Sequence, residues 1–243
     1  MQMLATAPTD TVKNGAPTVL QVDVASRLDF LRKVYGLFTV GLGTASVGCV
    51  VAIVARDIVF SVSPFVLFIG YIAAFFGTMA VRKVPMVNIV ALLGFTFLAG
   101  VMLAPAILGT LAAKGLEVGM ANILTAFLGT TIAFGGLTAY VFISRKDFSY
   151  IGGFLAVGLF GLIGIMLCTY LLPMFGLSFG ISPGMWIAIN TFGLLLMCGF
   201  VLYDTSMIMR HYATDEYVMG ALALFLDFIL IFQYLLALLN SRD

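Results

Sequence analysis

Residues 201–240 read VLYDTSMIMRHYATDEYVMGALALFLDFILIFQYLLALLN, two apolar segments that flank one short polar turn. Each apolar segment carries a single carboxylate, Asp204 in the first and Asp227 in the second. An ionisable side chain inside an apolar membrane segment is energetically costly, and by default it is a candidate functional residue. These two acids are therefore the first candidates for a functional site.

The spacing of the two aspartates predicts that they form a pair. Both are equidistant from the centre of the polar turn, which falls between Asp215 and Glu216. In an antiparallel helical hairpin such residues lie at the same depth, roughly 10–15 Å from the membrane surface at 1.5 Å rise per residue. Two adjacent carboxylates in a low dielectric share a proton, which indicates proton sensing or cation coordination. Calcium takes six to eight oxygen ligands, so Asp204 and Asp227 would form only a weak calcium site.

The composition of the whole chain is that of a membrane protein. Of its 243 residues, 62% are hydrophobic and 9% are charged, whereas about a quarter of a soluble chain is charged. Within hydrocarbon, only helices and closed barrels satisfy their backbone hydrogen bonds, and uninterrupted apolar runs favour helices. The net charge of +1 and the scattered basic residues argue against nucleic-acid binding. The single histidine, His211, lies in the polar turn, where we expect it to be solvated.

Charged residues divide the chain into seven apolar segments. Their predicted ranges are 34–55, 58–81, 84–113, 118–144, 149–171, 184–210 and 217–239. One crossing needs about 20 residues, so the uncharged stretch 148–203 holds two, separated by the prolines and glycines of residues 172–185. We therefore predict an all-α, polytopic bundle of seven transmembrane helices over residues 27–243, preceded by a disordered cytoplasmic tail of residues 1–26.

The basic residues predict a cytoplasmic N-terminus under the positive-inside rule. In that orientation three basic residues fall on the outer side, Arg56, Lys114 and Arg242. The inner side carries Lys13, Arg27, Arg32, Lys33, Arg82, Lys83, Arg145, Lys146 and Arg210. Seven crossings place the C-terminus outside. The alternative is a re-entrant last helix, weakened by Asp227, which would return the C-terminus to the inner side.

Arg82 is a candidate partner for the acid pair, because it closes the second apolar segment at the inner face. An Arg82–Asp204 salt bridge would close the inner end of the bundle, and protonation of the aspartate would release it. The alternative is that Arg82 is a plain positive-inside anchor. An intramembrane aspartyl protease is not favoured, because Asp227 follows Phe225-Leu226 and lacks the glycine loop that admits a peptide. We do not expect an enzyme.

Five stretches spread along the chain carry a family likeness, and the chain resembles the transmembrane Bax inhibitor motif family (Bax inhibitor-1 type), in particular its bacterial YccA-type members. The stretches are FLRKVYGLFTVGL (30–42), FTFLAGVMLAPAI (95–107), TAYVFISRKDFSYIGGFL (138–155), LYDTSMI (202–208) and ALALFLDFILIFQYLL (221–236). The resemblance implies a seven-helix fold with the last helix central.

The resemblance also implies roles for three residues. Asp204 and Asp227 match a pH-sensing pair that gates a calcium (cation) leak, and Arg82 matches a latch arginine. Where family members continue with Ile-Asn after the LDF element, this chain has Ile229-Leu230, so we expect a weak calcium site. We expect a monomer in the bacterial inner (plasma) membrane, in contact with lipid, with calcium or protons as partners and no cofactor.

A second function class comes with the YccA-type likeness. Such proteins resemble modulators of FtsH, an ATP-dependent membrane protease, and act as slowly degraded substrates through a cytosolic N-terminal tail. Residues 1–26 suit that role. The presence of both Asp204 and Asp227 favours the ion leak over the interaction role.

Overall fold

The protein is a single bundle of α-helices in a computed structural model that describes residues 17–59, 61–171 and 180–241. The elements are α1 (Val24–Val54), α2 (Arg56–Val59), α3 (Pro64–Ala80), α4 (Val87–Ser144), a 3-10 turn η1 (Ser149–Ile151), α5 (Gly152–Leu171), α6 (Pro183–Arg210) and α7 (Tyr217–Asn240). Over these residues there is no strand, and only an isolated bridge joins Thr18 to Ala213. The predicted all-α fold is confirmed.

Five of the described elements are long and apolar enough to cross a membrane: α1, α4, η1 with α5, α6 and α7. The predicted membrane class is therefore supported, by length and composition. Helix α3, with 17 residues, covers the predicted second crossing, but it is shorter than the about 20 residues that a perpendicular crossing needs. The count of seven crossings stays a prediction.

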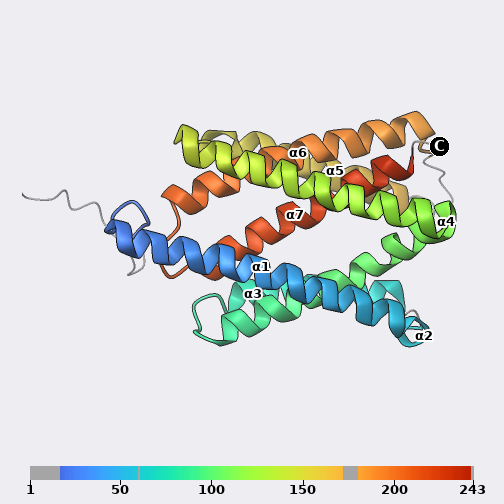
Figure 1. The fold of residues 1–243 in the computed structure, drawn as a ribbon, viewed down its shortest axis with the longest axis horizontal. Helices are drawn as coiled ribbons and strands as arrows, with labels where there is room; N and C mark the ends of the chain where they lie inside the picture. The colour runs from blue at the N-terminus through green and yellow to red at the C-terminus, as the bar shows by residue number, and fades with distance from the viewer. Residues whose placement is uncertain (1–16, 60, 172–179, 242–243) are drawn as a thin grey trace, which may run out of the picture.

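Helix α4 spans two of the predicted segments and is broken between them. It has 58 residues, about 87 Å at 1.5 Å per residue, more than twice the hydrocarbon thickness of about 30 Å. The break is at Gly115, whose φ of 78° and ψ of 171° are not helical, and Figure 1 shows the chain turning back there. Since only glycine adopts a positive φ without strain, the residue type fixes the position of the turn.

Replacing Gly115 by alanine is expected to destabilise the protein by about 1–2 kcal/mol, the cost of a Cβ at positive φ. Gly136 is the matched control, because it lies within α4 and a Cβ added there would meet no heavy atom within 4 Å. Alanine at that position should stabilise the helix by up to about 1 kcal/mol. Thermal unfolding in detergent measures both. Equal melting temperatures for the two variants would contradict the argument.

Helix α7 lies inside the bundle, as the resemblance implies. It packs against α1, α4 and α6, and Figure 1 shows it running between α1 on one side and α4 and α6 on the other. Aromatic rings hold it in place: Phe228 meets Phe38 of α1 at 5.9 Å and Phe134 of α4 at 5.6 Å between ring centroids. Phe225, fully buried, meets Phe95 of α4 at 6.1 Å. The acid-bearing helix is therefore shielded by its neighbours.

The described part of the N-terminal segment, residues 17–23, packs against the α6–α7 turn. Residues 1–16 lie outside the described residues. Residues 17–23 lead into α1, which begins at Val24 with Asp23 as its N-cap. The backbone N–H of Val19 donates to the carbonyl of Tyr212 at 3.0 Å, and the Val19 side chain is fully buried. This burial ties residues 17–23 to the α6–α7 turn, and the predicted boundary after residue 26 stays a prediction.

Candidate functional site

The α6–α7 hairpin brings Asp204 and Asp227 together. Asp204 lies in the penultimate turns of α6 and Asp227 near the middle of α7. Their carboxyl groups are within hydrogen-bonding reach of each other. Asp227 is only 4% exposed, whereas Asp204 is half-buried. The predicted proximity of the two acids thus holds in the structure, while their roles as pH sensor and weak calcium ligands stay predictions.

Buried polar groups with few hydrogen-bond partners lie next to Asp204, which precedes Thr205 in α6. Among the described residues, the buried Oδ2 atom of Asp227 has no hydrogen-bond partner, and the buried hydroxyls of Thr205 and Tyr35 have none except each other. Tyr35 comes from α1, and its hydroxyl lies next to that of Thr205. Each unsatisfied buried polar group costs about 1–3 kcal/mol. Several in one region call for an explanation, and a site for water or a cation supplies one.

Tyr212 stands at the end of α6, in the turn that leads to α7. Burial raises the pKa of its phenol well above the usual range, and the negative charges of Asp204 and Glu216 raise it further. The phenol is therefore a neutral, half-buried group near the acid pair. Its backbone carbonyl holds the N-terminal segment through Val19. The turn is thus packed by the N-terminal segment as well as by the helices.

Arg82, the predicted latch, lies apart from the acids in this conformation. Among the described residues, the ion pairs are Lys33–Asp29, Arg56–Asp57 and His211–Asp147. Arg82 follows α3, which packs against α4, and its carbonyl accepts a hydrogen bond from Asn88 Nδ2 at 3.0 Å. This bond fixes the turn, and the half-buried side chain forms no salt bridge with Asp204 or Asp227 in the described chain. The latch stays a prediction.

A second polar cluster, which the sequence did not predict, joins the α4–α5 connection to the end of α6. Asp147 Oδ1 accepts hydrogen bonds from the backbone of Ser149 at 2.9 Å and from Ser206 Oγ at 3.2 Å. Its Oδ2 lies 3.5 Å from His211 Nε2, so His211, expected to be merely solvated, has a carboxylate partner. The sequence does contain a sign of this turn, because an Asp two residues before a Ser, as in Asp147 and Ser149, is typical of an Asx turn.

These bonds lower the pKa of Asp147 to about 2, with the backbone N–H of Ser149 as the largest cause. Because the pKa is lower in the folded state, the stabilisation is complete above the unfolded value near 4 and is lost as the pH falls toward 2. We expect Asp147→Ala to cost about 1 kcal/mol at pH 7 and less at pH 3. Thermal unfolding across pH 3–7 measures this, with the exposed Asp215→Ala as control. The same loss at both pH values would contradict it.

The fold and the site define a class of protein: a helical, polytopic membrane protein whose last hairpin brings together two acids, one of them buried. A family model described as "Inhibitor of apoptosis-promoting Bax1" matches residues 27–243, so the chain belongs to the Bax inhibitor family. The predicted resemblance is confirmed.

The chain is similar to proteins from a bacterium, a yeast and a virus. It is 34% identical to an uncharacterized protein of Campylobacter jejuni, with 87% of this chain and 88% of that protein aligned. It is 34% identical to Bax inhibitor 1 of Schizosaccharomyces pombe, over 95% of this chain and 83% of the relative. It is 30% identical to a Golgi anti-apoptotic protein of vaccinia virus, over 95% and 92% of the two chains.

Proposed function

We propose that the protein is a pH-sensitive leak pathway for calcium or another cation, controlled by Asp204 and Asp227. One observation carries the proposal: two carboxyl groups are in contact inside a helical membrane bundle, and one oxygen of Asp227 has no partner. A membrane protein keeps such costly groups where they serve a pathway for ions or protons.

The chemistry of the pair supplies the gate. With one shared proton, the two carboxyl groups attract each other and hold α6 against α7. When that proton leaves, two like charges in a low dielectric repel each other and attract a cation. The hairpin therefore has two states with different charge and different packing. Proton binding selects between them.

Calcium would bind weakly at this position. In the described part of the chain no group of three or more His, Cys, Asp and Glu side chains could hold a metal ion. An ion at Asp204 and Asp227 would need the hydroxyls of Tyr35 and Thr205, backbone carbonyls or water to complete six to eight oxygens. Weak binding suits a leak pathway, because an ion that passes through it must also leave its binding site.

The membrane arrangement that goes with this function has seven crossings, with the break at Gly115 dividing α4 into two. A cytoplasmic N-terminus follows from the basic residues, and a bacterial inner membrane is the proposed location, with the protein acting as a monomer. Helix α7, at 24 residues, is long enough to cross completely. A complete crossing places the end of α7, at Asn240, on the outer side.

The experiment is ion flux in liposomes. The purified full chain, reconstituted with a calcium-sensitive dye inside, is expected to pass calcium at a rate that changes by at most about tenfold per pH unit, the limit for one titrating proton. Empty liposomes give the background. Flux that equals the background at every pH between 5 and 8 would overturn the proposal, and flux independent of pH would remove the acid pair from it.

A second candidate function is restraint of an ATP-dependent membrane protease of the FtsH type. It is supported by the YccA-type likeness and by the polar sequence of the N-terminal segment, and residues 1–16, which precede the attached residues 17–23, are the proposed contact for the partner. Deletion of residues 1–16 is expected to abolish co-purification of the protease while calcium flux persists. The deletion ends before Val19, because removing that buried residue would disturb the bundle. Retained co-purification would contradict the role of the tail.

A further inference from the structure

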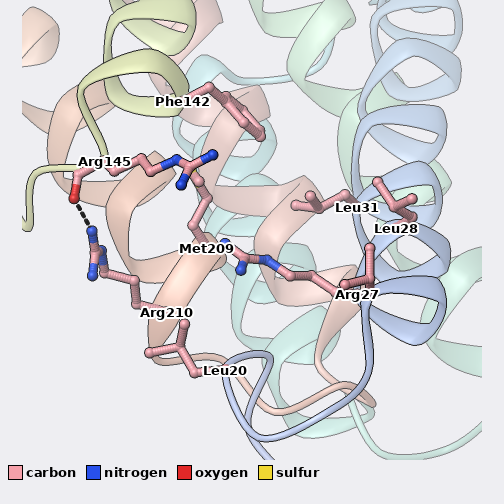
Figure 2. A pocket seen from close by; sticks show the side chains of 9 residues that line it. Leu20, Arg27, Leu28, Leu31, Phe142, Arg145, Met209 and Arg210 are labelled. Carbon is pink, nitrogen blue, oxygen red and sulfur yellow. Dashed lines mark hydrogen bonds between the residues drawn. The ribbon is translucent and has the colours of Figure 1, made fainter.

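A pocket of about 500 Å³ opens where the start of α1 meets the ends of α4 and α6. Three arginines line it, one from each element: Arg27 from α1, Arg145 from the C-cap of α4 and Arg210 from the last turn of α6. The remaining lining residues are apolar, and Figure 2 shows them together with the arginines. A strongly basic wall and an apolar wall thus share one cavity.

In the described part of the chain, no carboxylate pairs with any of the three arginines, and none lines the pocket. The Arg210 guanidinium donates to the backbone carbonyl of Arg145, which fixes the two residues side by side. Figure 2 shows the side chains of Arg27 and Arg145 extending toward each other with Met209 between them. Like charges gathered around one cavity repel, and an anion between them removes that repulsion.

The apolar wall indicates which anion fits. Leu20, Val24 and Leu28 line the pocket and are 54%, 75% and 49% exposed. Exposed aliphatic side chains beside arginines offer nothing to a small inorganic anion, but they match an acyl chain that continues from a phosphate group. Guanidinium groups bind phosphate oxygens through paired, charge-assisted hydrogen bonds.

We propose that this pocket binds the headgroup of an anionic phospholipid, with its phosphate between the guanidinium groups of Arg27 and Arg145 and its acyl chain along Leu28 and Leu31 of α1. Basic pockets between membrane helices are suited to such headgroups. The bound lipid bridges α1, α4 and α6, and it does so at the end of α6 that follows Asp204. This site does not depend on the proposed ion leak.

The test is lipid binding by the purified full chain in detergent, followed by native mass spectrometry and titration. Phosphatidylglycerol is expected to bind more tightly than phosphatidylcholine. Near a surface, each basic residue contributes about 1 kcal/mol to binding of an anionic lipid. Arg27→Gln and Arg145→Gln should therefore each weaken binding roughly fivefold, and the double variant roughly 30-fold. Arg27→Lys, which keeps the charge, should retain most of the affinity.

Arg32→Gln is the matched control, since Arg32 is an exposed arginine of α1 that does not line the pocket. An equal loss in Arg32→Gln would mean that general surface charge binds the lipid, and it would overturn the site. In a separate competition experiment, sodium phosphate or glycerol 3-phosphate is added to the protein together with phosphatidylglycerol. Should either compete at the affinity of phosphatidylglycerol, the ligand is a soluble phosphate and the lipid proposal fails. Equal binding of the two lipids would also overturn it.

Discussion

Replacing Gly100 by alanine is expected to destabilise the bundle by about 2–3 kcal/mol, the upper part of the range for overpacking. A Cβ at this position would lie 1.8 Å from the carbonyl oxygen of Ala45, 2.6 Å from its carbonyl carbon and 2.9 Å from its Cα. All three are backbone atoms, which cannot rotate away as a side chain can. The only relief is a separation of α4 from α1.

That separation would undo the contacts on either side of the crossing. The hydroxyls of Thr44 and Thr96 lie 2.6 Å apart across the same interface. Small residues that let two membrane helices approach closely allow such hydrogen bonds and tight van der Waals contact. One methyl group therefore disturbs a whole helix pair, and the loss exceeds what its volume alone would cause.

Gly94 provides the matched control, because it lies on the same helix and a Cβ there meets nothing within 4 Å. Gly94→Ala should stabilise α4 by up to about 1 kcal/mol, the usual gain from replacing glycine within a helix. Thermal unfolding and size-exclusion profiles in one detergent compare the two variants. Because the two changes are chemically identical and of opposite expected sign, a melting temperature for Gly100→Ala at or above wild type would show that α1 and α4 do not cross as described.

Much of the fold could be predicted because membrane helices are local features. An apolar run without charges determines a helix by itself, and this is why the helical segments were found. The meeting of Asp204 and Asp227 was also accessible, since both lie in one hairpin and their distance from its turn fixes their relative depth. The short turn between the two helices is therefore enough to predict that the two aspartates meet.

Contacts between distant segments could not be predicted in the same way. Asp147 meets Ser206 and His211 only because the α4–α5 connection folds under the end of α6. The gathering of Arg27, Arg145 and Arg210 depends equally on how three helices end at one level. Conversely, placing Arg82 on the inner face was not enough to pair it with Asp204. A shared membrane side gives the depth of a residue but not its direction around the bundle.

The acid pair itself leads to the second large effect. Asp204→Asn and Asp227→Asn are each expected to abolish the pH dependence of calcium flux, and the double variant is expected to be no worse than either single one. An amide can still hydrogen-bond to its neighbour but does not titrate near neutral pH. When two groups share one proton, the titration belongs to the pair, so losing either member removes the whole response.

The decisive measurement is therefore whether the effects of Asp204→Asn and Asp227→Asn on flux add in the double variant. Coupling between contacting residues typically amounts to about 0.5–3 kcal/mol, which corresponds to about a 2- to 150-fold departure from additive effects on flux. Asp215→Asn, in the exposed turn of the same hairpin, serves as the control and should keep the wild-type pH profile. Effects of the two single variants that add independently would mean that each aspartate acts alone. In that case the contact between their carboxyl groups would be a feature of packing, and the gate would have to lie elsewhere in the bundle.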